Sequence, residues 1–228
     1  MAFKNEHAPS ILMKLLLSVG ILMGTLIPAL LMSGHGDFLT QHLKLRTLEG
    51  NAHRQLLMVS CSLIYLFRFA ICMFVFFKRK IGWFEGSLVS LLFFMMFYLF
   101  NTSAGSHLEP IGMIDIAGIF LYLTGSCINT VADYQRYAWK RNAENKGRLY
   151  TEGLFKYSMH INYFGDSIMY IGLAMITLEY VCLFVSVIII LNFVFLQIPM
   201  LDKHLSEKYG DEFEEYLKRT KKFIPFVY

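Results

Sequence analysis

The chain contains the stretch YVCLFVSVIIILNFVFLQIPM at residues 180–200. No Asp, Glu, Lys, Arg or His occurs in it. A helix needs about 20 consecutive apolar residues to cross the hydrocarbon core of a bilayer, and this stretch is long enough to do so. It therefore predicts a membrane-spanning helix.

Five other stretches are also apolar, and one of them is short. They lie at residues 11–33, 55–77, 83–101, 111–131 and, for the short one, 164–178. Hydrophobic residues make up 56% of the 228 residues and charged residues 17%, whereas charged residues form about a quarter of soluble domains. We therefore predict an all-α, polytopic integral membrane bundle of about six transmembrane helices that forms one membrane domain over residues 1–228.

The basic residues indicate the orientation in the membrane, because Lys and Arg concentrate in cytoplasmic loops. They gather in the amino-terminal segment with Lys4 and Lys14, in the loop at 78–80, in the long loop before the fifth stretch, and after the sixth. We therefore predict that both termini are cytoplasmic. Residues 34–54 fit this orientation less well, since they place three basic residues on the opposite side.

The segment at 203–222 is polar, with apolar residues that recur near helical spacing and a break at Gly210. It predicts an amphipathic helix on the cytoplasmic end of the bundle. Residues 223–228 are apolar, and we expect them to dock as a plug or lid. The four cysteines fall inside the apolar stretches, which predicts buried thiols rather than a disulfide or a metal site.

Polar residues enter the apolar stretches mainly in the second half of the chain. Asn129, Asp133 and Tyr137 are four residues apart, and Arg136 and Lys140 continue the same helical stripe. Ionisable residues at the edge of a bilayer are costly and indicate a functional site. The stripe suits a phosphate-bearing or otherwise polar ligand, although the two cations could also simply extend into water.

Three ordered motifs in this half resemble a known family. They are NTVADYQ at 129–135, GLFKYSMHINYFGD at 153–166, and a last group made of LDKH at 201–204, KYGDEFEEY at 208–216 and FIP at 223–225. Together they resemble the steroid 5-alpha-reductase and sterol reductase superfamily, in its small bacterial form called the DUF1295 family. The resemblance covers roughly residues 111–228.

The resemblance implies a membrane-embedded enzyme that uses NADPH to reduce a carbon–carbon double bond in a steroid-like, sterol-like or fatty-acyl-like substrate. It also implies that residues 111–228 bind the cofactor, while the apolar helices of residues 1–110 hold the substrate. The positions that it assigns to cofactor binding are Arg68, Asn129, Asp133, Arg148, Asn162, Tyr163 and Asp166. His160 lies within the same signature and is a candidate catalytic residue, together with Tyr65.

Several of these positions have an alternative, structural interpretation. Tyr65 could donate a proton to the substrate, or could pack in a helix rich in phenylalanine. Arg68 lies in an apolar stretch, where arginine costs at least about 2.5–3.5 kcal/mol and needs a partner, which could be the cofactor or Glu85. Asp166 could cap the amino terminus of a helix instead of contacting a ligand. Tyr163 could be an interfacial anchor.

The sequence departs from the family pattern in two places. Met159 and Ile161 stand where the signature often has arginine and proline, which puts cofactor affinity or specificity in doubt. Residues 11–33 contain no carboxylate to pair with a tyrosine against a ketone, so a 3-ketosteroid substrate is not supported.

Two other functions remain open. The isoprenylcysteine carboxyl methyltransferases and related phospholipid methyltransferases are similar over the same region and bind S-adenosylmethionine. They share a His-centred signature and an acidic residue, for which Asp202 would stand here. A scaffold or channel whose polar residues only join helices is a non-enzymatic alternative. We expect a lipophilic substrate, contact with membrane lipid and no nucleic-acid partner; the oligomeric state is left open.

Overall fold

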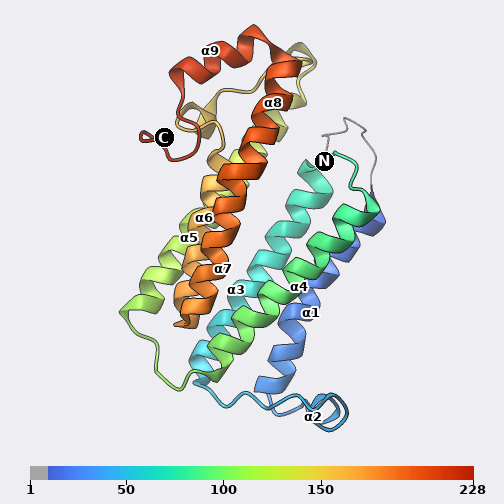
Figure 1. The fold of residues 1–228 in the computed structure, drawn as a ribbon, viewed down its shortest axis with the longest axis vertical. Coiled ribbons are helices and arrows are strands. Elements are labelled where there is room, and N and C mark those ends of the chain that lie inside the picture. The colour runs from blue at the N-terminus through green and yellow to red at the C-terminus, as the bar shows by residue number, and fades with distance from the viewer. Residues whose placement is uncertain (1–9) are drawn as a thin grey trace. The chain divides into compact units, whose positions relative to one another are not determined.

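A computed structural model describes residues 10–228, so the predicted cytoplasmic charge at Lys4 lies outside the described residues. Figure 1 labels the α-helices of the described chain. They are α1 (Ile11–Met32), α2 (Asp37–Leu43), α3 (Ala52–Ile71), α4 (Trp83–Ser106), α5 (Met113–Lys140), α6 (Ile161–Thr177), α7 (Tyr180–Asn192), α8 (Ile198–Tyr209) and α9 (Asp211–Arg219). Short 3-10 or π segments are η1 (Cys72–Phe76), η2 (Ala143–Asn145), η3 (Gly153–Lys156) and η4 (Phe193–Gln197).

Within residues 10–228, five helical segments are long and apolar enough to cross a membrane, and the chain is a polytopic helical membrane bundle. They are Ile11–Met32, Ala52–Phe76, Trp83–Ser106, Met113–Lys140 and Tyr180–Tyr209. The short stretch at 164–178 forms α6, which has 17 residues and is not among the five. The cytoplasmic placement of both termini stays a prediction.

The described chain divides into two compact units, and each is built from segments that are distant in sequence. Among the described residues, the first unit contains 121–170 and 186–228, and the second contains 10–120 and 171–185. The boundary therefore falls inside α5, α6 and α7. The prediction of one membrane domain stays a prediction.

The second unit packs α1 against α3 and α4. Its core contains the fully buried side chains of Ile21, Met58, Tyr65, Phe97 and Phe100. The predicted cytoplasmic charge at Lys14 is buried, and its Nζ donates a 2.7 Å hydrogen bond to the carbonyl of Phe77, the residue after η1. A cation inside an apolar span thus satisfies the carbonyls that a helix end leaves open.

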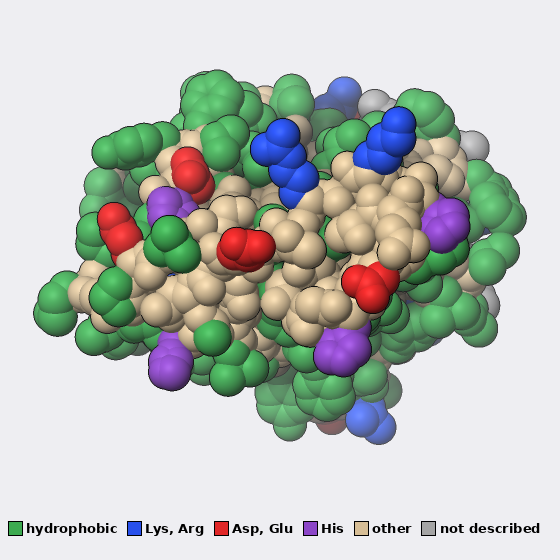
Figure 2. All heavy atoms as spheres, turned by 90° about the horizontal axis from the view of Figure 1, so that it is seen from below, with side chains coloured by type: hydrophobic (Ala, Val, Ile, Leu, Met, Phe, Trp, Pro, Cys, Tyr) green, Lys and Arg blue, Asp and Glu red, His purple; other side chains and the backbone are tan. Residues whose placement is uncertain are grey.

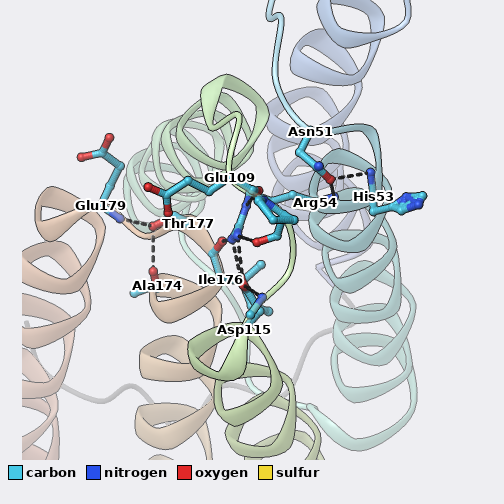
Figure 3. Close-up of polar contacts among 11 residues, drawn as sticks. Asn51, His53, Arg54, Glu109, Asp115, Ala174, Ile176, Thr177 and Glu179 are labelled. Atoms are coloured by element: carbon cyan, nitrogen blue, oxygen red, sulfur yellow. Dashed lines mark hydrogen bonds and ion pairs between the residues drawn. The ribbon is translucent and has the colours of Figure 1, made fainter.

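A buried ion pair joins four segments of the second unit (Figure 3). The guanidinium of Arg54 in α3 makes a two-pronged contact with Asp115 in α5, in which Nη2 lies 2.9 Å from Oδ2. Arg54 also donates to the carbonyls of Pro110 and Ile176, at 3.1 and 2.7 Å. Asp115 Oδ2 accepts a further bond from the backbone N–H of Gly112 at 2.8 Å. Because both side chains are at most 1% exposed, this pair is fully removed from solvent.

This ion pair reduces the number of basic residues that residues 34–54 can present as loop charges. One of its three basic residues is Arg54, which is neutralised inside the protein and does not act as a loop charge. Figure 2 shows one face of the protein, on which acidic, basic and histidine side chains are scattered among tan atoms and hydrophobic side chains make up much of the margin. Such an apolar margin is expected of helices whose sides face lipid.

The first unit is held together by the close crossing of α5 and α6. A Cβ added at Gly165 would lie 2.8 Å from the backbone nitrogen of Asn129, which is closer than side-chain carbons tolerate. Small residues at such a crossing let two helix backbones approach and are common between membrane helices. The crossing brings the polar residues of α5 and α6 together.

The predicted amphipathic segment at 203–222 forms two helices. α8 continues from α7 through η4, and α9 begins after Gly210, whose φ of 48° lies in the left-handed region that favours glycine. Phe213 and Tyr216 of α9 are buried, as their helical spacing predicts. None of the four cysteines, which all lie within residues 10–228, forms a disulfide, as predicted, but only Cys61, Cys72 and Cys182 are buried; the prediction of a buried thiol is wrong for Cys127, which is exposed.

Candidate functional site

An apolar cluster forms the base of the candidate site in the first unit. Its buried members are Ala132, Tyr150, Phe155, Met159, Ile161, Phe213 and Tyr216. They come from α5, the loop after it, the start of α6, and α9. The cluster therefore fixes the polar loop at 141–160 on the helices that carry the predicted site residues.

Tyr216 joins α9 to this loop through its hydroxyl, which donates a 2.6 Å hydrogen bond to the carbonyl of Phe155. Burial raises the pKa of Tyr216 far above its ordinary value, and burial followed by the charge of Glu152 also raises the pKa of Tyr150. Both phenols therefore stay neutral at physiological pH, and Tyr216 remains a hydrogen-bond donor.

Tyr216→Phe is expected to lower the free energy of unfolding by about 1–3 kcal/mol, because the buried carbonyl of Phe155 loses its donor. The measurement is the apparent melting temperature of the detergent-solubilised protein. Tyr180→Phe is the matched control, since Tyr180 is 89% exposed and the same hydroxyl is removed there. Equal melting temperatures for the two variants would contradict this role of Tyr216.

His160 lies at the centre of the site and is 1% exposed. Its Nε2 is 2.7 Å from Oδ1 of Asp202 in α8, and Oδ2 of the same carboxylate accepts a 3.0 Å bond from Lys222 Nζ. Asp202 is 13% exposed and Lys222 40% exposed on their side chains. The carboxylate of Asp202 thus holds both the buried imidazole ring of His160 and the partly exposed ammonium group of Lys222.

The segment after α9 is paired with the start of α6. The backbone N–H groups of Met159 and His160 donate to the carbonyls of Lys221 and Lys222, at 2.8 and 3.0 Å. Ser158 Oγ lies 3.1 Å from the carbonyl of Lys222 and 2.8 Å from that of Phe223. We call residues 221–223 the strap, because they hold the backbone that carries His160.

Aromatic rings surround His160. Its ring stacks on Tyr163 with centroids 5.9 Å apart, and Tyr163 stacks on Phe193 of η4 at 4.9 Å. The three rings are nearly parallel, with interplanar angles of 20° and 19°. Tyr163 therefore packs beside His160 and is half-buried.

Asn129 and Asn162 meet at the crossing of α5 and α6. Asn129 is 5% exposed, and its Nδ2 donates a 3.1 Å hydrogen bond to the backbone carbonyl of Asn162. The side chains of Asn162 and Asp166 are both half-buried and one helical turn apart. Because α6 begins at Ile161, Asp166 lies in its second turn, and the alternative that Asp166 caps this helix is wrong.

Asp133 and Arg148, the two charged residues predicted to bind the cofactor, are less buried than Asn129 and His160. Asp133 accepts a 2.6 Å hydrogen bond from Arg136, whose guanidinium lies over the ring of Phe155 at 5.4 Å. Arg148 is 65% exposed, and its Nε is 3.8 Å from Glu212. An exposed ion pair of this length contributes little to stability, so Arg148 can exchange Glu212 for an anionic ligand.

The structure places seven of the predicted site residues in the first unit. They are Asn129, Asp133, Arg148, His160, Asn162, Tyr163 and Asp166. Tyr65 and Arg68 belong to the second unit, where the Arg68 guanidinium lies 5.0 Å over the ring of Tyr65. Glu85, considered above as a partner of Arg68, forms an ion pair with Arg79.

Asp202 and Lys222 complete the site but were not predicted as parts of a reductase. Asp202 was considered only for the methyltransferase alternative, although it follows an apolar stretch closely and is therefore a costly charge. Lys222 is one of several basic residues near the end of the segment at 203–222. Nothing in the sequence pattern indicates that Lys222, rather than another of them, contacts Asp202. The expected lid at 223–228 docks only in part, because Phe223 is 5% exposed whereas Phe226 is 77% exposed.

Comparison with known proteins gives one family match. A family model described as "Protein of unknown function (DUF1295)" matches residues 39–220, which is more than half of the chain. No curated protein matches the chain.

Proposed function

The chain belongs to the DUF1295 family, and from this premise we propose that it is a membrane-embedded reductase that uses NADPH to reduce a carbon–carbon double bond in a lipophilic substrate. The observation that carries the proposal is the gathering of amides, carboxylates and His160 in the first unit. The side chain of Asn129 donates a hydrogen bond to the backbone carbonyl of Asn162 in the next helix. His160 lies two residues before Asn162 in the sequence.

The chemistry of these donors fits a dinucleotide. Arg136, Arg148 and Lys222 are partly exposed cations, which suit phosphate groups. Asn162 offers a donor and an acceptor, as a carboxamide or ribose partner must. The stack of His160, Tyr163 and Phe193 offers flat aromatic surface next to these groups. When bound, NADPH would supply the hydride, and the protein would supply position and protons.

His160 is the residue that we propose for proton transfer. Asp202 Oδ1 accepts from His160 Nε2, which orients the ring and favours a proton on that nitrogen. The stack with Tyr163 limits rotation of the ring. The strap holds the His160 backbone, and His160 is only 1% exposed.

Asn162→Ala is expected to weaken NADPH binding about 2- to 13-fold, the range that loss of one hydrogen bond of 0.5–1.5 kcal/mol gives. The fold should persist, because the bond between α5 and α6 uses the backbone carbonyl of Asn162, which alanine retains. The measurement is titration of reduced-nicotinamide fluorescence. Asn192→Ala, at an exposed position of the same unit, is the control. An unchanged dissociation constant for Asn162→Ala would place the cofactor elsewhere.

The pairing of His160 with Asp202 also favours a second candidate. A His-centred signature with an acidic residue near the start of α8 is what the membrane methyltransferases share with this chain. In that case the same unit would bind S-adenosylmethionine, and an exposed cation such as Arg148 would be less important, because S-adenosylmethionine carries no phosphate. Arg148→Ala should therefore weaken NADPH binding while leaving S-adenosylmethionine binding unchanged.

A further inference from the structure

Residues 223–228 expose an apolar surface beside the loop at 141–160. Phe226, Val227 and Tyr228 are 77%, 70% and 57% exposed, and Ile224 is 39% exposed. The ring of Phe226 lies 5.5 Å from that of Tyr157, which is itself 48% exposed. Four of these five exposed side chains belong to one short segment, and the fifth, Tyr157, contacts the ring of Phe226. We call these five side chains the aromatic patch.

The backbone under the aromatic patch is a closed turn. The N–H of Phe223 donates to the carbonyl of Tyr228 at 2.6 Å, and the N–H groups of Val227 and Tyr228 donate to the carbonyl of Ile224 at 3.1 and 3.0 Å. Phe226 has a φ of 66°, a region in which bulky residues are uncommon. The turn is tied to the core by Phe223, which is buried, and by its carbonyl bond to Ser158. The turn therefore presents the rings of Phe226 and Tyr228 to the surroundings from a backbone that is held in place.

The two sequence segments that carry the aromatic patch contain more basic than acidic side chains. Residues 217–228 contain Lys218, Arg219, Lys221 and Lys222 and no carboxylate side chain, and of these Lys222 is paired with Asp202. Residues 153–163, which carry Tyr157, also contain no Asp or Glu and include Lys156. Lys156, Lys218 and Lys221 are exposed. Exposed aromatic rings surrounded by lysine are typical of segments that lie in the headgroup layer of an anionic membrane.

We propose that the aromatic patch is an interfacial anchor, which inserts into the headgroup layer of the bilayer that this protein spans and prefers anionic lipids. The occupant is lipid because the aromatic rings match the polarity of the interface and the lysines match the lipid charge. The anchor continues directly into the strap on His160 and Asp202. Insertion would therefore also hold the strap in place. The inference does not depend on which cofactor the first unit binds.

The test places a photoreactive residue in the aromatic patch. Phe226 is replaced by p-benzoylphenylalanine, and the protein is reconstituted in nanodiscs made of equal parts phosphatidylglycerol and phosphatidylcholine. After irradiation, the intact mass of the protein identifies any adduct. We expect lipid adducts on most of the crosslinked protein, with phosphatidylglycerol at least threefold over phosphatidylcholine.

Two further variants serve as controls. The same residue placed at Phe223, which is 5% exposed, should give crosslinks within the protein and few lipid adducts. In the Phe226 background, Lys218→Gln with Lys221→Gln should bring the ratio of the two lipids close to one; both residues are exposed, so the fold should not change. Adducts at position 226 only within the chain, or to a second copy of it, would overturn the proposal. An equal yield of the two lipids without the lysine changes would overturn the preference for anionic lipid.

Discussion

Asp115→Ala is expected to lower the free energy of unfolding by about 3–5 kcal/mol, because it leaves the guanidinium of Arg54 buried without its carboxylate. Arg54 is 0% exposed, and Asp115 accepts from both its Nη1 and Nη2 atoms. The pair joins α3, the 109–112 loop, α5 and the end of α6, so its loss should loosen the second unit. The apparent melting temperature in detergent measures the effect.

The matched control for this change is Glu85→Ala. Glu85 also pairs with an arginine, Arg79, but both side chains are about 30% exposed, so the loss should be at most about 1 kcal/mol. The double change Arg54→Met with Asp115→Leu should recover much of the stability, since it leaves no buried charge unpaired. If Asp115→Ala melts at the same temperature as Glu85→Ala, the buried pair does not stabilise the second unit.

His160→Ala is expected to slow the proposed NADPH-dependent reaction about 10²- to 10⁴-fold, the range attributed to a positioned acid–base group. The backbone bond from residue 160 to the Lys222 carbonyl remains in this variant, so the strap should keep its place. Asp202→Ala should also slow this reaction, because it removes the hydrogen-bond partner of His160 Nε2. The measurement is NADPH oxidation by reconstituted protein given an unsaturated sterol or an unsaturated fatty acyl ester.

Lys203→Ala is the control for these changes, since Lys203 follows Asp202 directly but is 79% exposed on its side chain. The Lys203→Ala variant should oxidise NADPH at the same rate as the unchanged protein. Rates for His160→Ala and Asp202→Ala that match the control would mean that the buried pair has only a structural role.

The membrane helices could be predicted from the sequence because the length of an apolar stretch directly reflects the thickness of the bilayer. The ends of the helices were harder to predict. α6 begins at Ile161, three residues before the apolar stretch at 164–178, because polar residues can occupy the first turn of a helix. α5, by contrast, runs to Lys140, as the helical stripe of Asn129, Arg136 and Lys140 predicts. The hydropathy pattern also has no signal for the π segments η1 and η4.

The candidate site was predictable where it is local in sequence. Asn129, Asp133, Asn162 and Asp166 repeat at four-residue spacing within two helices, and the crossing of those helices brings Asn129 to Asn162. The contacts of His160 with Asp202 and Lys222 join residues far apart in the chain, so no spacing rule reveals them. For the same reason Arg54 was counted as a loop charge, although Asp115 at the start of the next polar helix is its partner.

In the proposed reductase, the first unit binds an anionic redox cofactor. The most direct test compares the melting temperature of the detergent-solubilised protein with NADPH, NADH and S-adenosylmethionine, since a ligand that binds only the folded state raises it with the logarithm of its concentration. We predict that NADPH raises the melting temperature in a concentration-dependent way and that Arg148→Ala reduces this rise. A rise with S-adenosylmethionine and none with NADPH would contradict the reductase proposal.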